Sequence, residues 1–159
     1  MPKANSYTTV EQANEYLNGL LGTEMWAKAE ESDKERALAS ATLRIDALEG
    51  TGGGFRGRRT DPGQPLAFPR APDVEVPEAV KNACALEAAA LFEHAADPAS
   101  SSRERAIRQG VASASVGGAS ESYRSLSELR GGMRGRLASD MALALLAPYM
   151  AAKGVYPIR

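Results

Sequence analysis

Apolar residues recur at helical spacing in several stretches of the chain, and this pattern predicts a mainly α-helical fold. The four predicted helices cover residues 9–22, 33–48, 77–95 and 137–152. The 159 residues suit one domain with a modest hydrophobic core, so we assign residues 1–159 to a single domain. The expected architecture is a small helical bundle.

Cap residues predict where the first two helices begin and end. Thr8 or Thr9 begins the first helix, since each is followed three residues later by Glu or Gln, the spacing of a capping box. Gly22 is expected to end this helix as a C-cap. Ser32 and Glu35 form another potential capping box at the start of the second helix.

Prolines mark the other two long helices. Pro77 opens the third helix, where its missing N–H costs nothing. Pro148 is expected to kink or end the fourth. Residues 24–30 predict a short helical turn that places Met25 and Trp26 in the core.

A weakly apolar β-hairpin is predicted between the third and fourth helices, at about residues 106–123. Its two strands are joined by Gly117 and Gly118, a two-residue turn signal. An isolated hairpin of this kind is marginally stable in water. We therefore expect it to pack either on its own domain or on a neighbouring copy.

The loop of residues 50–76 is rich in glycine and proline and is expected to form an exposed arm. Loops of this length in compact domains are usually functional or disordered. Its arginines and phenylalanines are Phe55, Arg56, Arg58, Arg59, Phe68 and Arg70. Such a cluster suits single-stranded nucleic acid, through charge and stacking, or a protein interface, where arginine pairs with carboxylates. Two phenylalanines are too few for a stacking track, and glycines and Asp61 dilute the positive charge, so we favour the protein interface.

The last residues, 153–159, form an extended tail that carries Val155, Tyr156 and Ile158 after a glycine. An apolar tail of this kind suits insertion into a pocket of another protein. The alternative is a tail that folds back on its own core.

No residue set predicts catalysis, a metal site or a cofactor site. The single cysteine, Cys84, and the single histidine, His94, exclude an internal disulfide and a Cys/His metal cluster. Carboxylate pairs such as Glu87 and Glu93 have no neighbours in the sequence that would desolvate them. The glycine-rich run at residues 52–57 lacks the Lys-Ser/Thr ending of a P-loop. We expect a protein that is not an enzyme.

Membrane insertion and export are also not expected. No apolar run approaches the roughly 20 residues of a membrane helix, and the first residues lack the apolar core of a signal peptide. The expected site of synthesis is therefore the cytosol.

Charge is unevenly distributed along a chain whose net charge is only −1. Residues 1–50 carry nine acids and five bases, whereas residues 101–159 carry four acids and nine bases. An acidic front and a basic back would let identical subunits attract head to tail, or place one end near an anionic partner. The alternative is that both ends are simply solvated.

The order of these features resembles a family of small tailed-bacteriophage proteins, the head–tail connector adaptors, also called head-completion proteins. Some members carry the label of a DnaT-like single-stranded-DNA-binding protein. The resemblance covers nearly the whole chain. It rests on SYTTVEQANEYL, ATLRIDAL, FRGRRTDPGQPLAFPR, VPEAVKNACALEAAALF, VASASVGGASESY and LALLAPYM, in that order, with the loop motif the most diagnostic. Residues 124–136 are longer and richer in Gly and Arg than this family's pattern.

The resemblance implies a structural virion protein, assembled in the host cytoplasm, that forms a ring of twelve copies below the portal. The ring would bridge the portal protein to the stopper or tail-completion protein and continue the DNA channel without sequence specificity. The C-terminal segment would dock on the portal. The implied interface residues are Arg56, Arg58, Arg59, Phe68, Arg70, Tyr123, Val155, Tyr156, Ile158 and Arg159. The alternative function is a single-stranded-DNA-binding replication accessory protein.

Overall fold

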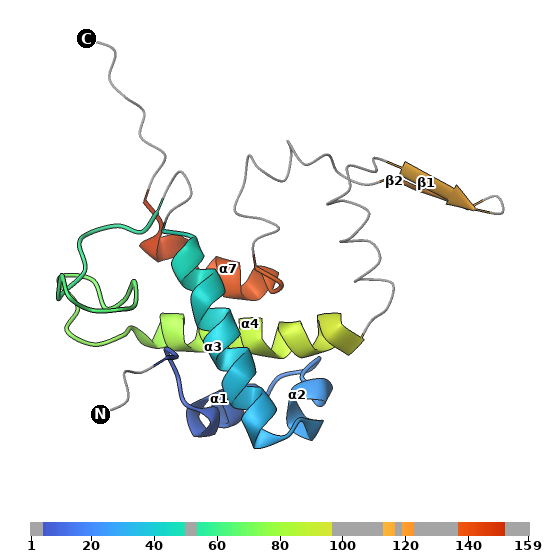
Figure 1. Cartoon of the computed structure of the whole chain (residues 1–159), viewed down its shortest axis with the longest axis horizontal. Coiled ribbons are helices and arrows are strands. Elements are labelled where there is room, and N and C mark those ends of the chain that lie inside the picture. Colours follow the sequence, from blue (N-terminus) through green and yellow to red (C-terminus); the bar gives the residue numbers. More distant parts are fainter. Residues whose placement is uncertain (1–4, 50–53, 97–112, 117–118, 123–136, 152–159) are drawn as a thin grey trace, which may run out of the picture.

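The protein is mainly helical in the computed structural model, which describes residues 5–49, 54–96, 113–116, 119–122 and 137–151 (Figure 1). The described residues contain five α-helices, one 3-10 helix and almost no strand. The elements are α1 (Val10–Leu17), α2 (Glu24–Lys28), α3 (Glu31–Ala47), α4 (Glu78–Ala96), β1 (Ser113–Val116), β2 (Ala119–Ser122), α7 (Asp140–Leu146) and η1 (Ala147–Tyr149).

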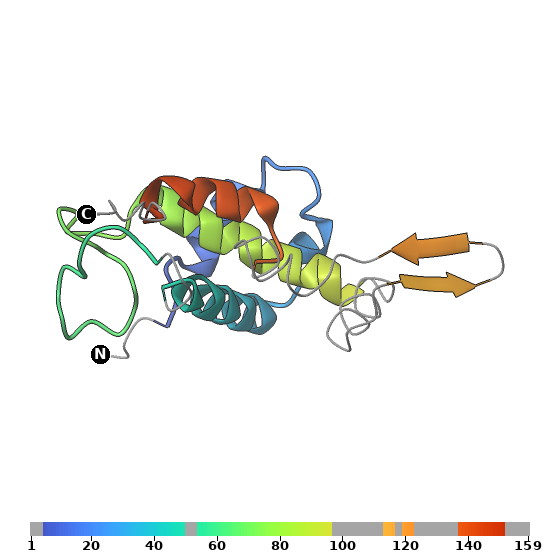
Figure 2. The same cartoon turned by 90° about the horizontal axis from the view of Figure 1, so that it is seen from above.

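Helix α4 is the centre of the helical body, since it contacts α1, α2, α3 and α7. Figure 2 shows α7 lying along α4, with α3 on the opposite side. Small side chains on α4 let these helices approach closely, and Ala83, Ala85 and Ala88 are all buried. The prediction for this helix is confirmed to within one residue at each end, and Pro77 immediately precedes it.

Helix α1 begins as predicted and ends early. Thr9 is its N-cap, and the capping box with Gln12 is present. The helix stops at Leu17 rather than at residue 22, because Asn18-Gly19 is a turn-forming pair. Leu21, which falls inside the predicted helix 9–22, lies in the connection after α1 and is 97% exposed.

Helix α3 starts without the predicted cap. Its N-cap is Glu30, whose side chain makes no capping hydrogen bond, so the prediction of a Ser32–Glu35 capping box is wrong. The carbonyl of Glu30 instead accepts the first backbone bonds, from the amides of Asp33 and Lys34. Tertiary packing of this long helix makes a strong cap unnecessary.

Helix α2 brings Trp26 into the core, as predicted, while Met25 stays 36% exposed. The indole of Trp26 donates to Asn14 Oδ1 at 2.9 Å, and its ring packs edge-to-face on Phe92 with centroids 5.9 Å apart. A buried tryptophan with a satisfied N–H is an anchor for packing. Trp26 therefore joins α1, α2 and α4.

The C-terminal helix is shorter than predicted. α7 ends at Leu146, two residues before Pro148, and a single 3-10 turn follows. Proline cannot continue the α-helical hydrogen-bond ladder, so this ending follows from the sequence.

The hairpin β1–β2 is antiparallel and pairs Val116 with Ala119 and Ser113 with Ser122. Figures 1 and 2 show both strands apart from the helices. The rest of the predicted hairpin, residues 106–112 and 123, lies outside the described residues, as does the tail 153–159.

A buried carboxylate joins α3, α4 and α7. Glu87 on α4 is fully buried, so the prediction that its position is not desolvated is wrong. Its Oε1 accepts from the amide of Ala138 at 2.8 Å, and its Oε2 accepts from that of Ser139 at 2.9 Å. Arg44 Nη1 on α3 donates to Oε1 at 3.2 Å. Both backbone donors lie at the start of α7, where a negative charge is favoured.

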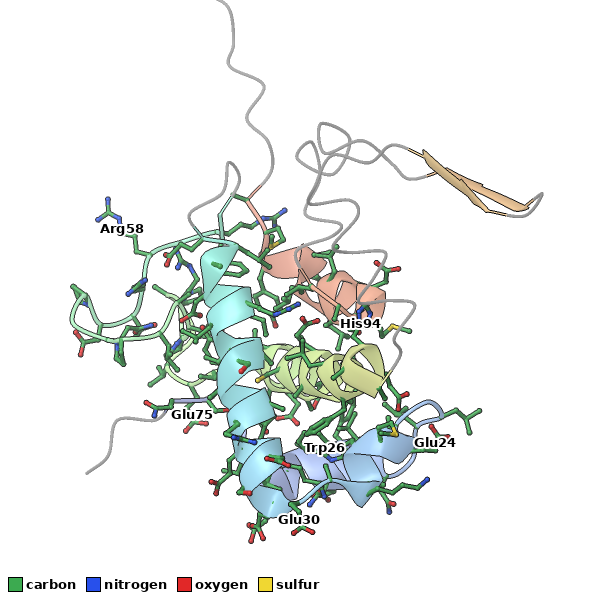
Figure 3. All side chains as sticks on the ribbon, turned by 45° about the vertical axis from the view of Figure 1, so that its right-hand side comes forward. Glu24, Trp26, Glu30, Arg58, Glu75 and His94 are labelled. Atoms are coloured by element: carbon green, nitrogen blue, oxygen red, sulfur yellow. The ribbon has the colours of Figure 1, made fainter. Side chains whose placement is uncertain are left out.

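Replacement of this carboxylate is expected to destabilise the fold. Glu87→Gln keeps the volume but leaves Arg44 without its counter-charge, so we expect a loss of about 3 kcal/mol in the free energy of unfolding. Urea denaturation measures this loss. The control Glu75→Gln, at an exposed position before α4 (Figure 3), is expected to change stability by less than about 0.5 kcal/mol. Equal stability of the two variants would contradict a stabilising role for Glu87.

Candidate nucleic-acid and partner interface

The loop between α3 and α4 folds back on itself. Phe55, Ala67 and Phe68 are buried, whereas most of its other described residues are exposed. Its two halves pair through an isolated antiparallel bridge between Arg59 and Arg70. On either side of this bridge, the amide of Thr60 donates to Pro69 O at 3.1 Å and that of Ala71 donates to Arg58 O at 2.9 Å. The loop is therefore a short, hydrogen-bonded arm with a defined path.

Glu49, just after α3, holds two of the four loop arginines. Arg59 Nη2 donates to its Oε2 at 2.6 Å, and Arg70 Nη1 donates to its Oε1 at 2.8 Å. The Arg59 hydrogen bond is the main cause that holds the pKa of Glu49 below its usual value, and Arg70 adds to it. Glu49 was not singled out from the sequence, because nothing in its spacing relates it to arginines ten and more residues away.

Arg70 stabilises the loop by hydrogen bonds from its side chain to backbone carbonyls of the loop. Its side chain is 11% exposed, and besides Glu49 it donates to the carbonyls of Arg56 at 2.8 Å, Gly57 at 2.6 Å and Ala67 at 3.2 Å. Gly57 has φ +71°, and a Cβ there would lie 2.9 Å from the Ala71 carbonyl oxygen. This position therefore requires glycine.

The loop's phenylalanines are in the core. Phe68 is 2% exposed and Phe55 is 6% exposed. The Phe68 ring packs edge-to-face on Phe55 at 4.6 Å, on Tyr149 at 5.7 Å and on Tyr7 at 5.9 Å between centroids. The hypothesis that these two phenylalanines form a stacking track for bases is therefore wrong for the described fold.

Tyr7, in the segment before α1, packs against the same aromatic cluster around Phe68. The Tyr7 hydroxyl donates to Asp46 Oδ1 and accepts from the amide of Phe68, while the amide of Ala67 donates to Asp46 at 3.3 Å. Burial is the largest cause that raises the pKa of Tyr7 and of Asp46. Neither residue was singled out from the sequence, since the contact joins positions far apart in the chain.

The remaining two loop arginines are solvent-exposed. Arg56 uses Nε to bind the Met150 carbonyl at 2.8 Å, yet its side chain stays on the surface. Arg58 points away from the helical body, and no side-chain partner is found for it in the described part of the chain (Figure 3). Among the predicted interface residues, Arg56 and Arg58 thus lie at the surface. Phe68 is buried and the Arg70 side chain is mostly covered, whereas the exposure of Arg59 is intermediate. Tyr123, Val155, Tyr156, Ile158 and Arg159 lie outside the described residues.

The helical body as a whole is acidic. Residues 5–49, 54–96 and 137–151 carry sixteen Asp and Glu against nine Lys and Arg. Residues 97–136 carry seven arginines against four acids. Since DNA is an anion, electrostatic attraction favours the arginine-rich part and the two exposed loop arginines over the helices.

Within the described residues there is no group of three or more Asp, Glu, His or Cys that would hold a metal ion. None of the helices there is long and apolar enough to span a membrane.

Comparison with protein families gives a match over the whole chain. The profile of the family described as "Putative DnaT-like ssDNA binding protein" matches residues 1–159. The chain belongs to this family. Neither the curated proteins nor the solved structures yield a match to this chain.

Loss of Glu49 is expected to make stability less dependent on pH. Its pKa is lowered in the folded state, so its stabilising effect is present above the unfolded pKa of about 4.3 and is lost as the pH falls through the folded value. Glu49→Gln is expected to cost about 1 kcal/mol at neutral pH and nothing in strong acid. Urea denaturation across this pH range measures the difference, with Glu75→Gln at an exposed position as the control. A constant difference at every pH would contradict the assignment.

Proposed function

We propose that the protein binds single-stranded DNA through the phosphate backbone. The observation that carries this proposal is membership of the DnaT-like family over the full length of the chain. The exposed side chains of Arg56 and Arg58 support it, since arginine pairs well with phosphate. The arginine excess in residues 97–136 adds sequence-independent attraction.

Phosphate contact is favoured over base stacking by the burial of the aromatic rings. The exposed large apolar side chains of the described residues are all aliphatic or methionine: Leu20, Leu21, Met25, Leu43, Val74 and Met141. Proteins that hold single strands tightly at high salt usually add stacking to charge. Binding led by charge alone is weak at physiological salt and strengthens steeply as salt is lowered.

DNA binding is tested with a fluorescently labelled oligothymidylate and fluorescence anisotropy over a series of salt concentrations. The full-length protein is expected to bind at low salt, with log K falling linearly against log salt. Arg56→Gln with Arg58→Gln is expected to lower the magnitude of that slope by about 0.7 per arginine that contacts phosphate.

The matched control uses Arg36, an exposed arginine on α3 that pairs with Asp33 away from the loop. Arg36→Gln changes the net charge by one but is expected to leave the slope unchanged. Absence of binding at low salt would remove the proposal. If the loop and control variants changed the salt slope by the same amount per charge removed, the loop would have no specific role in DNA binding.

A second candidate function is a ring-forming adaptor between a phage portal and the stopper or tail proteins. The resemblance of the ordered motifs carries it, and the position of the β1–β2 hairpin apart from the helices favours it (Figure 1). A two-stranded hairpin is marginally stable by itself. Packing against another chain would bury one face of the hairpin and so stabilise it. In this function the tail 153–159 docks on the portal, and the protein is a part of the virion.

The adaptor function predicts closed rings. Negative-stain electron microscopy of the purified full-length protein, alone and with a portal protein, is expected to show them. Deletion of residues 155–159 is expected to leave the helical content seen by circular dichroism unchanged and to abolish portal binding. A monomer that ignores the portal but binds oligothymidylate would exclude the adaptor and favour the first candidate. Unfolding on deletion would show that the tail folds back on its own core.

A further inference from the structure

A groove of about 510 Å³ lies between the segment that leads into α1 and the N-terminal half of α3. Its lining includes the apolar side chains of Val10, Leu38 and Ala39. Leu38 is buried, whereas Val10 is only partly covered. The groove therefore offers apolar contact surface beside the N-terminal half of α3.

Three carboxylates line the same groove. Glu11, Glu31 and Glu35 are all exposed, and none makes an ion pair with another residue in the described ranges. The one base in the lining, Arg36, already pairs with Asp33. The groove thus combines an apolar lining with a net negative rim, which fits a partner segment that carries both arginines and apolar side chains.

The groove lies across α3 from the start of α7. Glu35 and Arg44 are nine residues apart, about two and a half helical turns, so they face opposite sides of α3. Arg44 contacts Glu87, which binds the amides of Ala138 and Ser139. The point where the chain enters α7 is therefore on the far side of α3 from the groove.

We propose that the groove binds residues 124–136 of a second copy of the chain. This segment reads RSLSELRGGMRGR and carries four arginines against one glutamate. It also carries Leu126, Leu129 and Met133, which match the apolar lining. The charge of the segment is therefore opposite to that of the groove rim.

A second copy is favoured over the segment's own chain by the position of the groove. Residue 136 directly precedes Leu137, which is buried in the core cluster next to the start of α7. The chain's own segment would have to pass around α3 to reach the groove, whereas that of a neighbouring copy can approach it directly. The resulting contact is head to tail, with different surfaces on the two copies.

The test measures self-association of the full-length protein without DNA or portal, so its outcome does not depend on DNA binding or on portal binding. The groove and segment variants then separate this contact from any other contact that could build the rings of the adaptor function. Sedimentation velocity at low salt is expected to show a weight-average mass that rises with concentration above 16.8 kDa. The rise is expected to shrink as salt screens the charges. Glu11→Gln, Glu31→Gln and Glu35→Gln together are expected to weaken association roughly tenfold, the scale of two or three exposed ion pairs.

The matched control removes three exposed acids outside the groove, by Glu15→Gln, Glu24→Gln and Glu75→Gln, and is expected to leave association within about twofold of the parent. The reciprocal variant, Arg130→Gln, Arg134→Gln and Arg136→Gln, is expected to reproduce the groove variant. Its own control is Arg103→Gln, Arg105→Gln and Arg108→Gln, with equal charge loss in another part of the chain. Circular dichroism melts verify that every variant is folded.

Charge reversal gives the decisive result. A copy with Glu31→Lys and Glu35→Lys and a copy with Arg130→Glu and Arg134→Glu are each expected to associate less than the parent. Mixed together, they are expected to recover association, because the reversed groove now attracts the reversed segment. Isotope-labelled mixing with chemical cross-linking then reports whether groove and segment join within one chain or between two. Cross-links within one chain, a monomer at all concentrations, or equal weakening by groove and control variants would overturn the proposal.

Discussion

The buried carboxylate of Glu87 is the constraint on which the arrangement of the C-terminal helix depends. It belongs to α4, the helix that contacts every other long element, and it takes two backbone donors from the start of α7 and one guanidinium donor from α3. A carboxylate removed from water is tolerable only when such partners surround it. The three helices are consequently fixed in direction as well as in contact, which apolar packing alone does not achieve.

A second carboxylate, that of Glu49, fixes the loop in a similar way by binding two of its arginines. Glu49 receives two arginines, and Arg70 then distributes its other donors among the loop's own carbonyls. The loop is ordered from the inside by groups that would elsewhere serve as surface charges. This arrangement leaves Arg56 and Arg58 as exposed cations of the loop, on a backbone that the Glu49 and Arg70 contacts hold in place.

The sequence predicted those elements whose determinants are local. Thr9 and Gln12 specify the start of α1, Pro77 precedes α4, and Pro148 limits α7. The burial of Glu87 was not predicted, although the residue lies seven residues after Val80 and three after Cys84, on the buried stripe of α4. The arginine loop was not predictable in the same way. Whether Arg59 and Arg70 face solvent or Glu49 depends on a tertiary contact that no spacing rule encodes.

The loop has a further consequence for how the chain completes its fold during synthesis. The amide of Arg56 donates to the Tyr149 carbonyl, and that of Ala151 donates to the carbonyl of Gly54. The backbone hydrogen bonds of residues 54 and 56 therefore form only after residues 149 and 151 have been synthesised. While the ribosome is still translating the intervening stretch, Phe55 and Phe68 lack the Tyr149 ring that completes their cluster. This aromatic surface stays incomplete until Tyr149 has emerged, and apolar surface exposed in this way favours aggregation of folding intermediates.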